Sequence, residues 1–168
     1  MKISILLLIF SLLASSASTS FVSADTGSYV STVNNDFEEI KFTALMNDFR
    51  KENGLTPIQI SKRLNAVARW MVGDMIEVND ISHTDSYGRD PFQRMAALGY
   101  TGSMASGENL CAGTQTSTAE VAFKQWKNSP HHLENMLETR YKFMGIARGY
   151  GETTEYGWYW ANEFGSVE

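Results

Sequence analysis

The sequence predicts an α+β domain, with helices in the first two thirds of the chain and antiparallel strands at its end. Two long segments near the start of residues 36–168 repeat apolar residues with a helical period, and shorter segments with good N-cap residues follow. The tail holds two aromatic, β-prone runs, KFMGIARGYG and YGWYWANEFG, joined by ETTE. Helices followed by strands are typical of a small antiparallel sheet covered by helices.

Residues 1–24 have the layout of a secretory signal peptide. Lys2 precedes an apolar run of twelve residues, and small residues follow. We expect secretion with cleavage after Ala24, and a cut after Ala17 is the alternative. An uncleaved membrane anchor is the other interpretation, although the apolar run is short for a membrane span. We expect no membrane span elsewhere in the chain.

The secreted chain is expected to be one acidic domain. Residues 25–35 are polar and unpatterned and are interpreted as a linker, and residues 36–168 are enough for one core. Without the signal peptide, 13 Lys and Arg face 19 Asp and Glu, a formal charge of −6. This acidity argues against nucleic acid and against electrostatic binding to anionic membranes. We expect a monomer whose partner is a small molecule or an extracellular protein.

A single cysteine, Cys111, excludes an intrachain disulfide. Packing must therefore stabilise the domain. Cys111 is interpreted mainly as a buried apolar residue, with an intermolecular bridge or a reactive thiol as alternatives.

Two long helices are expected first. The first covers about residues 36–52 and ends at Asn53-Gly54. Its expected buried face consists of Phe37, Ile40, Ala44, Leu45 and Phe49. The second covers about residues 61–78, and its apolar stripe consists of Leu64, Ala68, Met71 and Met75. His83 lies in the loop that follows.

Three shorter helices are expected next. Asp90 caps a helix that begins with Pro91 and stops at Gly99. A Gly- and Ser-rich loop follows, with a short strand at its end. The pattern Ser117-x-x-Glu120 predicts a capping box and a helix over 118–128. A fifth, short helix is expected to begin with Ser129 as N-cap and Pro130 at its first position.

Two of the three histidines are adjacent, in SPHHLENM at residues 129–136. At about 100° per residue, Leu133, Met136 and Leu137 define the buried face of this helix. His131 then points to solvent, and His132 lies at the border between core and solvent. A position in the first turn disfavours the imidazolium and keeps His132 neutral, as a metal ligand or proton acceptor must be. The alternative is that His132 only packs the start of the helix.

Six blocks in order carry a resemblance to a known family. They are NDFRKENGLTPI (47–58), ISHTDSYGRDPFQRMAALGY (81–100), GENL (107–110), QWKNSPHHLENM (125–136), FMGIARGY (143–150) and YWANEFG (159–165). Together they resemble the CAP superfamily, or SCP domain, of cysteine-rich secretory, antigen 5 and pathogenesis-related proteins. The chain is most similar to the cysteine-poor branch common in bacteria.

The resemblance implies an α–β–α sandwich and a cleft lined by two histidines and two glutamates. The matching positions here are His83, Glu108 and His132. The second glutamate of the animal and plant branches comes three residues after a Trp, and here that position is Ser129. Members of the family bind divalent ions through the histidines, so His83, His132 and Glu108 are the candidate ligands of a zinc-like ion.

Two functions remain open on this evidence, besides a purely structural role for the cleft. The first is a secreted binding module whose cleft holds a divalent metal or a small, lipid-like ligand, without an organic cofactor. The second is an extracellular hydrolase, similar to a peptidase, in which His83, Glu108 and His132 are the candidate catalytic residues. The missing second glutamate favours binding over catalysis.

Overall fold

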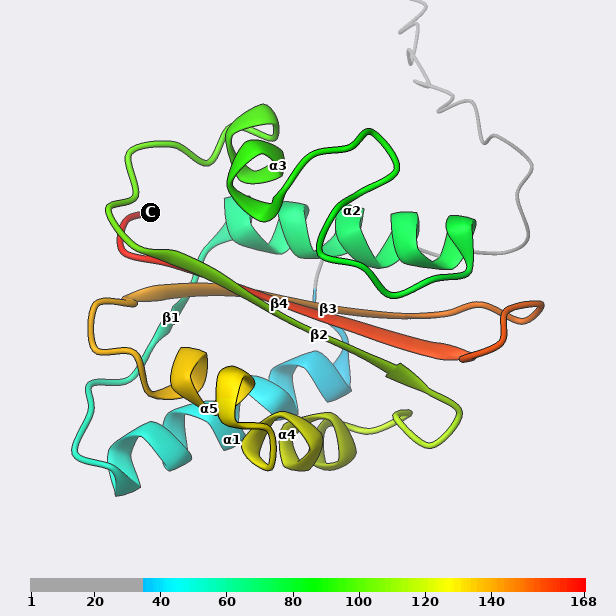
Figure 1. The fold of residues 1–168 in the computed structure, drawn as a ribbon. Helices are drawn as coiled ribbons and strands as arrows, with labels where there is room; N and C mark the ends of the chain where they lie inside the picture. Colours follow the sequence, from blue (N-terminus) through cyan, green and yellow to red (C-terminus); the bar gives the residue numbers. More distant parts are fainter. Residues whose placement is uncertain (1–34) are drawn as a thin grey trace, which may run out of the picture.

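A computed structural model describes residues 35–168. The predicted signal peptide, and all of the predicted linker except Asn35, lie outside these residues. A sheet occupies the middle layer, with α2 (Lys62–Val78) and α3 (Pro91–Ala97) on one face (Figure 1). The helices α1 (Phe37–Glu52), α4 (Ala119–Lys127) and α5 (Pro130–Leu137) cover the other face. The α+β fold and its three layers are therefore confirmed.

The sheet has four strands in the order β1-β3-β4-β2. The tail forms the expected hairpin of β3 (Phe143–Tyr150) and β4 (Trp158–Gly165), and β2 (Ser106–Gly113) pairs antiparallel with β4. The segment between the two long helices contributes β1 (Gln59–Ile60), which pairs parallel with β3, so the sheet is mixed. Because β2 pairs only with β4, it forms an edge of the sheet.

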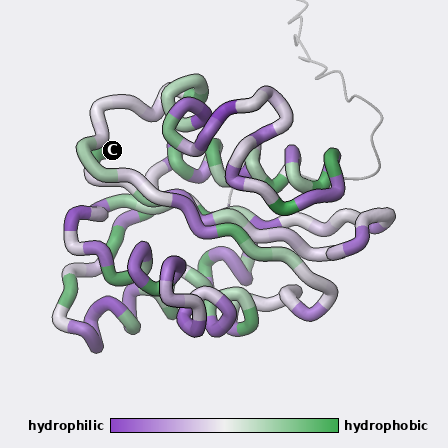
Figure 2. Tube along the Cα trace, in the orientation of Figure 1, coloured by the Kyte–Doolittle hydropathy of each residue, from purple (hydrophilic) through white to green (hydrophobic). Residues whose placement is uncertain are grey.

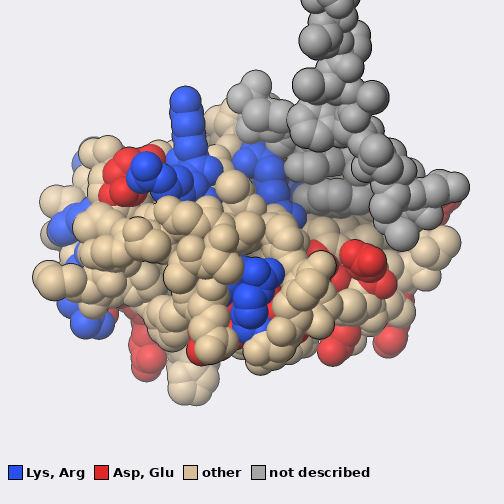
Figure 3. Space-filling model, turned by 90° about the horizontal axis from the view of Figure 1, so that it is seen from above, with Lys and Arg blue, Asp and Glu red and all other residues tan. Residues whose placement is uncertain are grey.

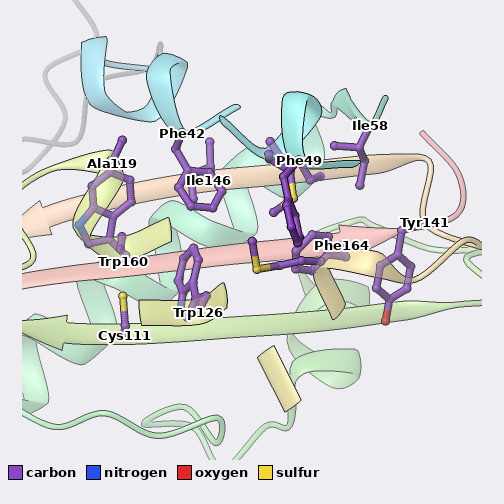
Figure 4. Packing of buried hydrophobic residues seen from close by; sticks show 14 residues of the cluster. Phe42, Phe49, Ile58, Cys111, Ala119, Trp126, Tyr141, Ile146, Trp160 and Phe164 are labelled. Carbon is purple, nitrogen blue, oxygen red and sulfur yellow. The ribbon is translucent and has the colours of Figure 1, made fainter. Parts of the chain in front are cut away.

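The largest core cluster lies between the sheet and the layer of α1, α4 and α5. Trp126 of α4 and Trp160 of β4 are fully buried, and both rings contact Phe42 of α1 (Figure 4). Each indole nitrogen donates to a backbone carbonyl, so neither polar atom is left unpaired. Packing of this kind takes the place of the disulfides that stabilise many small secreted domains.

Helix α2 packs closely on the other face of the sheet through the expected stripe of Leu64, Ala68, Met71 and Met75, each at most 1 % exposed. Its first turn lies directly over Gly145 of β3. A Cβ at Gly145 would lie 2.0 Å from the backbone carbon of Leu64. Glycine is required there because two backbones touch.

The buried face of α1 is only partly the expected one: Phe49 is buried as predicted, but other predicted residues are not. Phe37 and Ile40 are 73 % and 60 % exposed, whereas Phe42 and Met46 are fully buried. Polar groups decide the orientation: the inward face also carries Arg50, which donates to the carbonyl oxygens of Thr56, Met136 and Glu138. Apolar residues occur on both faces of α1, as the mixed colours along the helix in Figure 2 show, so their spacing could not choose between them.

The expected capping box at the start of α4 is also wrong. Thr118 occupies the N-cap without a side-chain hydrogen bond. The amide of Ala119 instead donates to Glu38 of α1 at 2.7 Å, and Glu120 forms an ion pair with Lys41 of α1. Tertiary contacts with α1 therefore replace the local cap.

Within residues 35–168, no helix is both long enough and apolar enough to cross a membrane. Figure 3 shows the face of the molecule formed by α2 and α3. Acidic and basic side chains are both present on this face.

Candidate functional site

His83 lies in the loop between α2 and α3, and buried carboxylates hold that loop in place. Asp74 of α2 accepts the amide of Ser86 at 3.0 Å. Asp85 accepts the amides of Tyr87 and Arg89 at 3.0 and 2.9 Å, and the Arg89 side chain at 2.7 Å. These bonds explain how an exposed loop presents His83 in one position.

Glu108 of β2 holds the His83 ring. Its Oε1 lies 2.6 Å from Nδ1 of His83. The His83 side chain is 56 % exposed and the Glu108 side chain only 1 % exposed. The hydrogen bond to Glu108 raises the pKa of His83. The pair therefore presents an oriented imidazole at the surface on a buried carboxylate.

Two residues that the sequence analysis did not place in the site complete it. Arg94 of α3 is fully buried, binds Oε2 of Glu108 and donates to the carbonyl oxygen of His83 at 3.2 Å. Glu163 of β4 stands opposite Glu108 in the sheet and is also fully buried. An acidic residue within the aromatic, β-prone run YWANEFG is the signal that could have identified Glu163.

The carboxyl group of Glu163 is a close neighbour of the Glu108 carboxyl group. Its Oε1 lies 3.6 Å from Arg94, and neither oxygen has a hydrogen-bond partner among the described residues. Burial raises the pKa of Glu163 well above its usual range, and the neighbouring Glu108 adds to this effect. Two negative charges directly opposite each other on adjacent strands repel, and the single positive charge of Arg94 can neutralise only one of them. One of the two glutamates is therefore a carboxylate and the other a carboxylic acid.

His132 and His131 differ as the helical angles predict. The side chain of His131 is 94 % exposed, whereas His132 is half-buried and its ring meets Trp126 edge-on, with centroids 6.5 Å apart. Nδ1 of His132 is buried and has no hydrogen-bond partner among the described residues. Burial lowers the pKa of His132, and the charges of His83 and His131 lower it further.

The two candidate histidines belong to opposite faces of β2. Glu108, which holds His83, faces α3, whereas the next residue, Asn109, faces α5 and donates to the carbonyl oxygen of His132 at 3.0 Å. His83 and His132 are near enough to influence each other electrostatically. Among residues 35–168, however, no three His, Cys, Asp or Glu side chains are grouped closely enough to hold a metal ion together.

The side chains considered as nucleophiles are those of Cys111 and Ser129. Cys111 points to the opposite face from Glu108, into the core with Trp126 and Phe42, and burial raises the pKa of its thiol. Ser129 is the N-cap of α5, but its hydroxyl makes no capping bond, contrary to expectation.

Comparison with known proteins identifies the family. The sequence model of the cysteine-rich secretory protein family (CAP) matches residues 43–164. This chain belongs to the CAP family. Over 126 residues the CAP domain is 33 % identical to the uncharacterized protein YkwD of Bacillus subtilis, covering 75 % of this chain and 46 % of YkwD. The chain thus spans about half the length of that relative.

Solved structures show the same fold. An outer surface protein of Borrelia burgdorferi aligns with a TM-score of 0.70 at 24 % identity, over 85 % of this chain and all of the other. An extracellular SCP-domain protein of Bacillus anthracis aligns with a TM-score of 0.66 at 22 % identity, over 77 % of this chain and 40 % of the other.

Proposed function

We propose that this CAP domain is an extracellular binding module whose binding site is formed by His83, Glu108 and His132. The observation that carries the proposal is the exposed His83 ring held on the buried Glu108 carboxylate. Because Nδ1 is engaged, Nε2 is the ring nitrogen available to a ligand. An oriented imidazole on a buried carboxylate is the arrangement that proteins use for metal-binding histidines.

A zinc-like ion fits two of the three predicted ligands. Nε2 of His83 is free to bind. In His132 Nδ1 is buried, so Nε2 is the nitrogen that would bind, and the lowered pKa of His132 keeps that ring neutral. Glu108 does not fit as a direct ligand, since one oxygen meets His83 and the other meets Arg94. Its part is to orient His83. The ion, when bound, would supply a Lewis acid to which a small anionic or polar ligand binds.

A hollow beside α3 supports an apolar portion in such a ligand. Its lining includes Phe92, Met95 and Tyr100, together with the hydroxyl groups of Ser103 and Ser106. Ser106 is two residues before Glu108 on the same strand, so the hollow adjoins the site. A hydrolase built on the same residues is less well supported, because the Cys111 thiol points away from Glu108 into the core.

Location outside the cell is part of the proposal. The aligned proteins of B. burgdorferi and B. anthracis are described as an outer surface and an extracellular protein. The signal sequence with cleavage after Ala24 agrees with such a location. The mass of the protein recovered from the medium tests this directly, since cuts after Ala24 and Ala17 give different N-termini.

Calorimetric titration of the secreted chain with zinc tests the site. The parent and a His131→Ala control should bind alike, because His131 faces solvent. His83→Ala and His132→Ala should each weaken binding by at least about tenfold, and Glu108→Gln by about 10- to 100-fold. Equal heats from all five proteins would eliminate the metal site. A loss of zinc binding confined to His131→Ala would show that the site had been assigned to the wrong histidine.

A further inference from the structure

Behind Glu108 lies a buried charge cluster made of Arg94, Glu108 and Glu163. Arg94 and Glu163 are fully buried, and the Glu108 side chain is 1 % exposed. The two glutamates are directly opposite each other on β2 and β4, and Arg94 reaches them from α3. Burying such a cluster is costly, and simple surface pairing does not account for it.

The donors and acceptors of this cluster determine where the His83 proton lies. A guanidinium only donates hydrogen bonds, so the group that Arg94 meets must accept. Glu108 accepts from Arg94 with Oε2 and turns its second acceptor, Oε1, toward Nδ1 of His83 at 2.6 Å. Two acceptors cannot face each other at that distance, so Nδ1 must carry the proton. In the neutral ring, Nε2 is then unprotonated.

We propose that Arg94 is a positioning residue that acts through Glu108 to keep the proton of neutral His83 on Nδ1 and to leave the Nε2 lone pair free. Arg94 also donates to the carbonyl oxygen of His83 at 3.2 Å, so it fixes both the backbone and, indirectly, the ring. The functional importance of a free Nε2 rests on the proposed binding function. The position of the proton on the His83 ring is independent of that function.

The decisive variant is Glu108→Gln. A glutamine side chain has the same shape, but it offers one acceptor oxygen and one donor NH2 group. Arg94 will take the oxygen, so the NH2 group will face Nδ1 of His83 and the proton will move to Nε2. Glu163, 3.6 Å from Arg94, remains available as the counter-charge. Nitrogen-15 spectra of the His83 ring, recorded at a pH above the pKa of His83, will show the change from an Nδ1–H ring in the parent to an Nε2–H ring in the variant.

A double variant separates Arg94 from the other neighbours of residue 108. Arg94→Met combined with Glu108→Gln removes the donor, and the neutral amide can turn its oxygen back to His83. The Nδ1–H ring should therefore return. Glu138→Gln is the matched control: this carboxylate pairs with the exposed Arg140 and should leave the His83 spectrum unchanged.

Two results overturn the proposal. If the His83 ring keeps its proton on Nδ1 in the Glu108→Gln variant, then Arg94 does not orient residue 108. This conclusion holds whether or not the double variant folds. A double variant that folds and stays in the Nε2–H form shows that something other than Arg94 is responsible. No ligand enters these spectra, so a failure to bind zinc would leave the positioning role standing.

Discussion

Gly145→Ala tests whether the close seating of α2 on β3 supports both the fold and the site. The added Cβ would lie 2.0 and 2.2 Å from the carbonyl carbon and oxygen of Leu64, and 2.3 Å from the amide nitrogen of Asn65. These are backbone atoms of a helix, so no side-chain rotation relieves the contact. Ordinary contact begins at 3.4 Å, and α2 must therefore move outward by roughly 1.4 Å.

Such a shift loosens the contacts of the apolar stripe of α2 with the sheet. A gap of about 0.5 to 1 Å already loses a quarter to a half of the attraction between packed atoms. We therefore expect a loss of about 3 to 5 kcal/mol, at the upper end of core substitutions and a large part of the stability of an ordinary domain. The thermal midpoint should fall by at least about 10 °C.

Urea unfolding followed by circular dichroism measures the free energy, and Gly107→Ala is the matched control. At Gly107 the three atoms nearest to the new Cβ belong to the side chains of Tyr141 and Asn135 and not to a backbone. Its cost should be clearly smaller. If Gly145→Ala unfolds within about 1 kcal/mol of the parent, then the close approach of α2 does not hold the layers together and the reasoning is wrong.

Individual residues give four further predictions. Arg50→Met should destabilise the domain by about 3 to 5 kcal/mol in urea unfolding, because it leaves buried carbonyl oxygens unpaired; a loss under about 1 kcal/mol would contradict this role. Cys111 should resist thiol reagents in the folded protein and react only on unfolding, so rapid labelling of native protein would refute its burial. In NMR titrations, His83 should titrate at a higher pH than His132, and the reverse order would refute the hydrogen bond to Glu108. Because its folded pKa is raised, His83 contributes stability below its unfolded pKa of about 6.5 and loses it as pH rises through the folded value. His132, with a lowered pKa, instead loses stability as pH falls from about 6.5 toward its folded value. Urea midpoints at about pH 5 and about pH 8 should show His83→Gln losing more stability on acidification than the parent and His132→Gln losing less.

Local patterns in the sequence were sufficient for much of the fold. The stripe of α2, the hairpin of β3 and β4, and the difference between His131 and His132 follow from the fixed periods of helix and strand. Each depends on residues within a few turns of one another, so periodicity carries the information. The ordered motifs were likewise sufficient to recognise the CAP family.

Only the tertiary structure decided which face of α1 is buried, how α4 begins and which charged groups surround Glu108. Arg50, Glu38 and Arg94 each bind groups far away in the sequence, and no local period records such partners. Glu163 is the clearest case, since 55 positions separate it from Glu108 and only the β2–β4 register brings the two carboxyl groups together. The sequence determined the layers and which of the two adjacent histidines is half-buried. The electrostatics of that site arise from long-range pairing, because the energy of a buried charge depends on partners that only folding places beside it.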